Sequence, residues 1–165
     1  MSISIRPATP ADLPEILAIV NHAIANTTAI YDVDQRTLEQ QTEWFNDKRG
    51  KDEPVIVAEK NGKVVGFGAY GIFKPKVGYR FSVEHSVYVN RQFVGQGIGK
   101  QLLSQLIETA KLQKMHTMVG YIDTENKGSI AFHQLFGFAE IGVLKEIGFK
   151  FGKRLNVSLM QLMLE

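Results

Sequence analysis

The chain has 165 residues, of which 44% are hydrophobic, and it carries a formal net charge of +2 with no cysteine. This length and apolar content suit a single folded domain over residues 1–165, and the nearly balanced charge does not indicate a nucleic-acid-binding protein. Without cysteine the chain can form no disulfide, no thiolate zinc site and no covalent cysteine intermediate.

The N-terminus begins directly in a strand pattern. Residues 2–7 alternate between apolar and polar side chains, without the basic and apolar regions of a secretory signal. No apolar run in the sequence approaches the ~18 residues that a membrane span requires. We therefore expect a soluble cytoplasmic protein with no membrane partner.

Two helices separated by a loop are predicted next. Positions 9–12 supply a capping threonine, a proline and an acidic residue, and the apolar residues that follow at helical spacing predict a helix ending near Asn26. The segment NTTAIYD, residues 26–32, is rich in side chains that bond their own backbone, so it predicts a loop. A second helix is expected over about residues 34–47.

The middle of the chain is predicted to be mostly strand. Asn61 and Gly62 lie between two β-rich runs over residues 55–73, a combination typical of a hairpin with a type I′ turn. The basic segment FKPKVGYR, residues 73–80, contains proline and glycine and predicts a loop. FSVEHSVYV, residues 81–89, resumes the strand pattern.

Three glycines at alternate positions, Gly95, Gly97 and Gly99, lie between this strand and a periodic helix. A flexible loop is one explanation, but the backbone N–H groups at a helix start can bind phosphate oxygens, which approach closely where side chains are missing. Gln101 stands where a nucleotide-binding P-loop has serine or threonine, and the G-x-G-x-G spacing differs from the Rossmann fingerprint. The pattern favours a cofactor pyrophosphate without a metal ion.

The C-terminal part completes a mixed arrangement. Residues 117–123 predict a strand, residues 129–136 a short helix, and residues 140–164 two strands around a turn region at 148–152. The complete order is β, α, α, β, β, β, α, β, α, β, β. This order predicts an α+β fold.

Five segments spread over nearly the whole chain resemble the GNAT superfamily of N-acetyltransferases, and more narrowly its phosphinothricin and methionine sulfoximine acetyltransferases. They are NTTAIYD, VEHSVYV, GQGIGKQLL, IDTENKGSIAFHQLFGF and GFKFGKRLNVSLMQL. The resemblance implies a GNAT fold, a single α+β domain with a central mixed, mostly antiparallel twisted sheet flanked by helices. It also implies a homodimer that transfers an acetyl group from acetyl-coenzyme A to the amine of a small amino acid or analogue. Because the chain has no cysteine, the transfer would be direct.

The resemblance further implies where acetyl-coenzyme A binds, with no metal ion. The pantetheine arm would follow the strand and the pyrophosphate would meet the glycine loop, at Val87, Tyr88, Val89, Gly95, Gln96, Gly97, Ile98, Gly99, Lys100 and Asn126. Asn126 has an alternative role as a helix N-cap. Val94 stands where the family usually has arginine or glutamine, which we expect to weaken the polar framing of this site, while Gln92 offers a shifted match.

Two residues are candidates for the chemistry. Acetyl transfer requires a base for the amine proton and an acid for the departing thiolate. The resemblance assigns the base to Glu84, and His133 stands where many relatives have a tyrosine that contacts the coenzyme A sulfur, so it could supply the proton. The alternatives are a surface carboxylate for Glu84 and a core histidine for His133.

An amino-acid substrate also needs an anchor for its carboxylate. Arg80 can form two parallel hydrogen bonds with a carboxylate, whereas a lysine offers a point charge. The residues expected to frame the substrate are Thr27, Thr28, Tyr31, Lys74, Pro75, Lys76, Arg80, Glu84, His85 and Ser86. For the lysines a solvated loop is the alternative. Family members tend to have an aromatic residue where Lys76 stands and tryptophan where Arg154 stands, so both positions bear on the substrate.

Two other functions fit the same residues. A protein N-acetyltransferase would show an open peptide groove instead of a pocket closed by a loop. A non-catalytic acyl-coenzyme A sensor would bind through the glycine loop, while Glu84 and His133 would carry out no chemistry.

Overall fold

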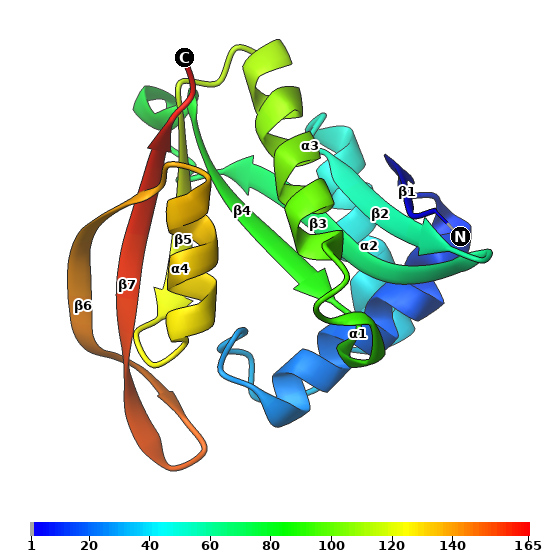
Figure 1. Ribbon diagram of the computed structural model, residues 1–165, viewed down its shortest axis with the longest axis horizontal. Helices are drawn as coiled ribbons and strands as arrows, with labels where there is room; N and C mark the ends of the chain where they lie inside the picture. Colours follow the sequence, from blue (N-terminus) through cyan, green and yellow to red (C-terminus); the bar gives the residue numbers. More distant parts are fainter. Residues whose placement is uncertain (1) are drawn as a thin grey trace.

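The computed structural model describes residues 2–165, in which seven strands form one sheet with helices on both faces (Figure 1). The strands are β1 (Ser4–Pro7), β2 (Val55–Lys60), β3 (Lys63–Ile72), β4 (Ser82–Val89), β5 (Thr117–Asp123), β6 (Ala139–Lys150) and β7 (Lys153–Met163). The α-helices are α1 (Leu13–Asn26), α2 (Leu38–Gly50), α3 (Ile98–Leu112) and α4 (Lys127–Leu135). The predicted order of elements and the α+β class are confirmed.

Two element boundaries differ from the prediction. Helix α2 begins at Leu38, later than expected, because Thr37 caps it: the Thr37 hydroxyl accepts the Gln40 N–H and the Gln40 side chain accepts the Thr37 N–H. Strand β6 continues through Gly148 to Lys150. The turn after it is only Phe151 and Gly152, both with positive φ, as a type I′ hairpin turn requires.

The sheet separates two hydrophobic cores. Alternate residues of β2 face opposite sides, as the two-residue period of a strand dictates. Val55 and Val57 pack with α1 and α2, whereas Ile56 and Ala58 pack with α3. Among the residues that the structure describes, no helix is both long and apolar enough to cross a membrane.

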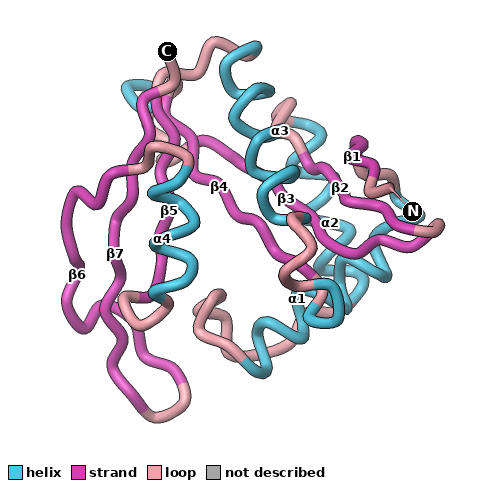
Figure 2. Tube along the Cα trace, in the orientation of Figure 1, coloured by secondary structure: helices cyan, strands magenta, loops and turns pink. Residues whose placement is uncertain are grey.

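The sheet opens between β4 and β5, and this opening positions the site. The strand order is β1-β2-β3-β4-β5-β7-β6, with β4 and β5 parallel and every other pair antiparallel. Residues Ser82–Glu84 of β4 pair with Thr117–Val119 of β5, after which the two strands diverge (Figure 2). The edges of the diverging strands leave space between two halves of the molecule, one built on β1–β4 and the other on β5–β7.

Candidate active site

The glycine loop leads from β4 into the start of α3. Gly97 is the N-cap of this helix with φ 76° and ψ 10°, a left-handed conformation that favours glycine. The N–H groups of Ile98, Gly99 and Lys100 have no carbonyl acceptor within the helix, because the first turn of any α-helix lacks them. The helix start therefore offers hydrogen-bond donors and a partial positive charge to an anion.

A cavity of about 1220 Å³ lies against this loop. All the residues predicted to bind the cofactor line it except Gln96, whose side chain accepts a hydrogen bond of 2.6 Å from the Lys60 ammonium. Val94 lines the cavity as well, but Gln92, the shifted match, does not. Much of the remaining wall is apolar and comes from α1 and α4, including Ile19, Ala23, Phe132, Leu135 and Phe136. This wall was not predicted from the sequence, although Phe132 and Phe136, one helical turn apart, were a visible signal for it.

A second cavity, of about 420 Å³, lies beside the first in the opening of the sheet. Five of the residues predicted to frame the substrate line it: Thr28, Tyr31, Glu84, His85 and Ser86. The two cavities adjoin, since they have six lining residues in common: Ala29, Val87, Tyr88, Asn126, Ser129 and His133. A group bound in one cavity can therefore meet a group bound in the other.

The other residues predicted for the substrate lie elsewhere. Thr27 lines the larger cavity. Lys74, Pro75, Lys76 and Arg80 are exposed on the loop after β3 and line neither cavity. The Arg80 guanidinium lies 4.6 Å from the centre of the Phe81 ring and donates a hydrogen bond to the Val77 carbonyl. Arg154, at the other divergent position, is exposed and lies over the Phe149 ring.

Glu84 lines the smaller cavity. It is in register with Gly71 of β3, and its side chain stays exposed to solvent. The surrounding walls partly desolvate the carboxylate, which raises its pKa, while the positive charges of Lys48 and Lys74 oppose this shift. A carboxylate with a raised pKa is better matched to proton transfer near neutral pH than an unperturbed one.

His85 and His133 form a buried pair next to this cavity. Their Nε2 atoms are 2.9 Å apart, while Nδ1 of His85 is 3.1 Å from the Val119 carbonyl oxygen and Nδ1 of His133 is 2.7 Å from the Ser129 carbonyl oxygen. Each of these three contacts needs one N–H hydrogen, but two neutral imidazole rings carry only two such hydrogens, one on each ring. The neutral pair therefore leaves one of the three contacts without a hydrogen, and one added proton would satisfy all three.

The environment of this pair disfavours added charge. Burial lowers the pKa of both rings, because it removes the water that would solvate a cation. Both nitrogens of His133 face protein groups, as a core histidine would, so His133 could act as an acid only by exchanging one of these contacts. The pairing with His85 was not predicted, because the two residues lie 48 positions apart.

Two polar atoms in the smaller cavity are buried without a hydrogen-bond partner in the described part of the chain. They are the hydroxyl of Tyr31 and Oδ2 of Asp123. Burial raises the pKa of Tyr31, and the charge of Asp123 adds to this shift. Buried polar groups normally find partners, so these two atoms are available to a bound molecule. Asp123 was not predicted as a site residue, although a carboxylate at the end of a buried strand was a visible signal.

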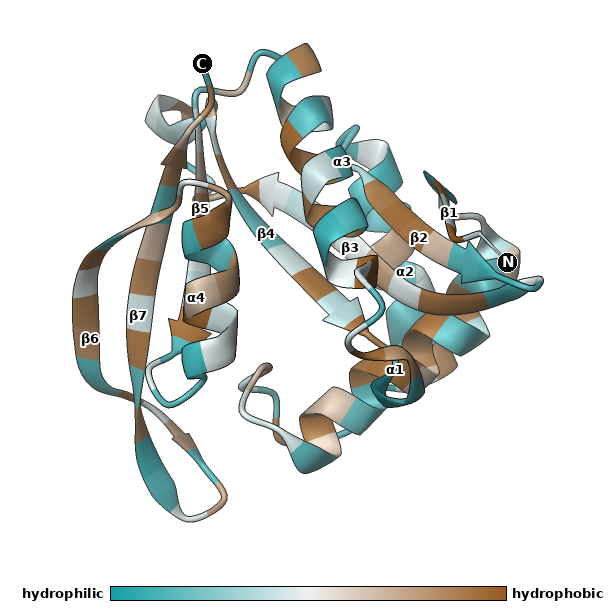
Figure 3. Cartoon of the chain, in the orientation of Figure 1, coloured by the Kyte–Doolittle hydropathy of each residue, from teal (hydrophilic) through white to brown (hydrophobic). Residues whose placement is uncertain are grey.

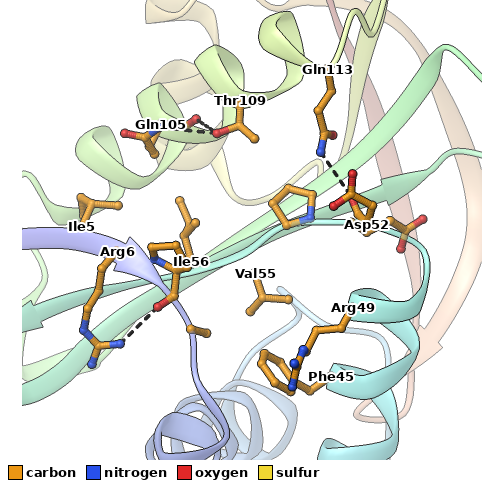
Figure 4. Close-up of a pocket in the computed structure, with 14 residues that line it drawn as sticks. Ile5, Arg6, Phe45, Arg49, Asp52, Val55, Ile56, Gln105, Thr109 and Gln113 are labelled. Carbon is orange, nitrogen blue, oxygen red and sulfur yellow. Dashed lines mark hydrogen bonds between the residues drawn. The ribbon is translucent and has the colours of Figure 1, made fainter.

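A third cavity, of about 580 Å³, lies away from these residues, between β1, β2, the end of α2 and the side of α3 (Figure 4). Several of its polar groups bond one another: Gln113 donates to the Asp52 carbonyl, Gln105 donates to Thr109, and Arg6 donates to the Pro7 carbonyl. Arg6 also pairs with Asp12 and Glu59, which do not line this cavity. None of the predicted site residues lines it. Among the described residues, no cluster of three or more potential metal ligands occurs.

Known proteins resemble this chain in both sequence and fold. Residues 18–138 match the model of the acetyltransferase (GNAT) family. The L-methionine sulfoximine/L-methionine sulfone acetyltransferase of Pseudomonas aeruginosa is 44% identical over 100% of this chain and 96% of its own length.

Two solved structures extend the comparison. The ribosomal-protein-alanine N-acetyltransferase of Brucella melitensis has a TM-score of 0.96 and 45% identity, covering 98% of this chain and 99% of that one. A phosphinothricin acetyltransferase of Sinorhizobium meliloti in complex with acetyl-coenzyme A has a TM-score of 0.95 and 33% identity, covering 99% of this chain and 89% of that one.

Proposed function

The chain belongs to the acetyltransferase (GNAT) family and is an N-acetyltransferase; we propose that it transfers the acetyl group of acetyl-coenzyme A to the α-amine of a small amino acid or amino-acid analogue. Analogues of the methionine sulfoximine, methionine sulfone and phosphinothricin type are the substrates that its relatives' names suggest. The observation that carries this proposal is the meeting of the two cavities along six shared residues, with Glu84 lining the smaller one.

The larger cavity fits the cofactor. A side chain at Gly95 or Gly97 would need a strained backbone, whereas the glycines leave the N–H groups at the start of α3 open to a pyrophosphate. Val87 and Val89 on β4 would line the pantetheine arm, opposite the apolar face of α4. When bound, acetyl-coenzyme A supplies the acetyl thioester.

Glu84 is proposed as the general base. An α-amine is mostly protonated at neutral pH, with a pKa of about 8 in peptides, and must lose a proton before it can attack. The partly desolvated carboxylate of Glu84 accepts that proton, directly or through a water. His133, at the junction of the cavities, is the candidate for returning a proton to the leaving sulfur after it releases one of its two protein contacts.

The smaller cavity has the features of an amino-acid site. A volume of about 420 Å³ lies within the usual range of roughly 300 to 1,000 Å³ for small-molecule sites. The hydroxyl of Tyr31 and Oδ2 of Asp123 are available to the polar groups of a substrate. Lys74 and Arg80 line neither cavity, but the charge of Lys74 acts on Glu84 in the smaller one, and we propose that the loop that carries both residues anchors the carboxylate.

We further propose that two copies of the chain associate through β6, and that the protein acts in the cytoplasm. Strand β6 lies at the edge of the sheet and has several hydrophobic positions along its length (Figure 3). Its exposed apolar side chains include Ile141, Val143, Ile147 and Phe149. An edge strand of this kind would aggregate if it stayed uncovered. Leu144 and Ile147 of the same strand also line the smaller cavity, so a partner copy would border the substrate. Sedimentation equilibrium should give a dimer, and Val143→Lys should shift it to monomer.

A second candidate is acetylation of a protein N-terminus, which the name of the Brucella melitensis structure favours. A peptide substrate extends beyond its first residue and needs an open groove. The loop of residues 27–31 instead crosses between the two cavities, which favours a small substrate.

The deciding experiment is a thiol-release assay with acetyl-coenzyme A. The panel contains the protein amino acids, methionine sulfoximine, methionine sulfone and phosphinothricin, and matched peptides that begin with alanine or serine. We expect turnover of a free amino acid or analogue with kcat/KM at least tenfold above that of any peptide. The reverse preference would identify a protein N-acetyltransferase.

A further inference from the structure

One lysine bridges the two halves of the molecule across the opening that holds both cavities. Helix α1 packs against the half built on β1–β4, while Lys150, the last residue of β6, belongs to the half built on β5–β7. Lys150 is only 3% exposed. Its ammonium lies 2.7 Å from the Thr27 carbonyl oxygen and 2.6 Å from the Ile30 carbonyl oxygen.

One of these two carbonyls lies at the end of helix α1, and the other lies in the loop that follows it. Thr27 is the C-cap of α1, where unsatisfied carbonyls carry partial negative charge and favour a cation. Ile30 lies in the following loop and lines the smaller cavity. One ammonium thus binds the carbonyl at the helix end and a carbonyl of the loop that crosses between the cavities.

A second contact from the same strand supports the bridge. A Cβ atom built on Gly148 would lie 2.3 Å from Cε2 of Tyr31, so the tyrosine ring rests directly on the glycine backbone. Any larger residue at this position would push the ring away. Tyr31 is one residue beyond Ile30, and its hydroxyl is one of the unpartnered atoms of the smaller cavity.

The loop has few other ties to that half. Among the described residues, the hydrogen bonds from residues 27–37 to residues 117–165 are the two that Lys150 donates. The other side-chain bonds of the loop, such as those of Arg36 with Asn21 and Asp32, stay within the first half. Loss of the lysine should therefore free the loop without removing a core contact.

The buried ammonium of Lys150 donates to two neutral carbonyls and lies 5.0 Å from the centre of the Phe151 ring, without a carboxylate in hydrogen-bond contact among the described residues, so it is costly for stability alone. Burial lowers the pKa of Lys150, and Asp32 opposes this shift only through its charge. A leucine or methionine would fill the same space without the cost of burying a charge. A lysine at this position is therefore explained by its hydrogen bonds, which hold two loop carbonyls in place.

We propose that Lys150 is a positioning residue that latches the Thr27–Tyr31 loop over the smaller cavity and thereby sets the affinity for the amino-acid substrate. The proposal rests on the function proposed above. It assigns to the C-terminal hairpin, which supplies no residue of the expected cofactor site, control over the closure of the substrate site.

The test compares Lys150→Met with Lys153→Met, a matched exposed lysine paired with Lys150 across the same turn. For Lys150→Met we expect KM for the amino acid to rise at least tenfold, since two hydrogen bonds to a charged donor are lost. The Kd for acetyl-coenzyme A should rise several-fold less than this KM, because the Thr27–Tyr31 loop supplies only Thr27 and Ala29 to the larger cavity, and Lys153→Met should match the wild type. Equal losses for both ligands, or no change in KM, would overturn the proposal.

A second measurement does not depend on activity. Hydrogen exchange of the ligand-free protein should quicken at least tenfold in residues 28–37 of Lys150→Met, with β3 unchanged. Gly148→Ala, which displaces Tyr31 from the same strand, should give the same pattern if Lys150→Met fails to fold. Unchanged exchange in the loop would refute the latch. If the wild-type protein acetylates no amino acid, the proposed function is refuted. The hydrogen-exchange result would then still decide whether Lys150 holds the loop in place.

Discussion

Asp12 should contribute measurably to the stability of the fold through one ion pair. Its carboxylate accepts two hydrogen bonds from the Arg6 guanidinium, at 2.8 and 2.9 Å, and one of 2.7 Å from the Thr9 N–H. The Asp12 side chain is 8% exposed. The bonds from Arg6 lower the pKa of Asp12 from its ordinary value of 3.8 to about 2, against the opposing effect of burial.

This pKa difference sets the expected magnitude. One pKa unit corresponds to about 1.4 kcal/mol, so the ionised carboxylate stabilises the fold by about 2 kcal/mol. Because the folded pKa is the lower one, this contribution is complete well above pH 3.8 and is lost as the pH falls towards 2. About half of it should remain near pH 3. In a chain of this length, Asp12→Asn should lower Tm by roughly 4 to 8 °C at pH 7.

The assay is urea unfolding of the wild type and Asp12→Asn between pH 3 and pH 7. Asp47→Asn is the control, because Asp47 pairs with Lys51 at a similar distance of 2.8 Å with both side chains about 60% exposed. An exposed pair of this kind contributes less than about 1 kcal/mol. Equal destabilisation by the two substitutions would refute the reasoning, as would an Asp12→Asn deficit that does not shrink towards pH 3.

Three further predictions concern the site. Glu84→Gln should lower kcat by roughly 10²-fold at pH 7 with unchanged Kd for acetyl-coenzyme A. The loss of kcat should shrink at higher pH, because more of the amine is then deprotonated. A variant whose kcat at pH 7 equals that of the wild type would exclude Glu84 as the base. Gly97→Val should abolish the thermal stabilisation by acetyl-coenzyme A. Gly62→Val, at a similar φ in the β2–β3 turn, should strain the backbone to a similar extent, but acetyl-coenzyme A should still raise the Tm of this variant. His85→Leu should cost about 1 to 3 kcal/mol by leaving a nitrogen of His133 unpaired, and a loss of stability in His133→Gln without a fall in kcat would show His133 to be structural.

The helices, strands and turns of this protein could be predicted from patterns of residues that lie close together in the sequence. The order of elements could be predicted because periodicity, caps and turn residues act within a few positions of the chain. Asn61 and Gly62 specify their hairpin in this way. The glycines before α3 likewise indicated an anion site, because both the loop and the free N–H groups of the helix belong to one continuous segment.

Tertiary structure alone decided which distant residues meet. The packing of helices and strands brings His133 to His85, and it places Lys150 against the Thr27 carbonyl across 123 positions. It also leaves Arg80 outside both cavities, although Arg80 lies only four positions from Glu84 in the sequence. Such contacts depend on how helices and strands pack, and no local period encodes the packing partner of a side chain.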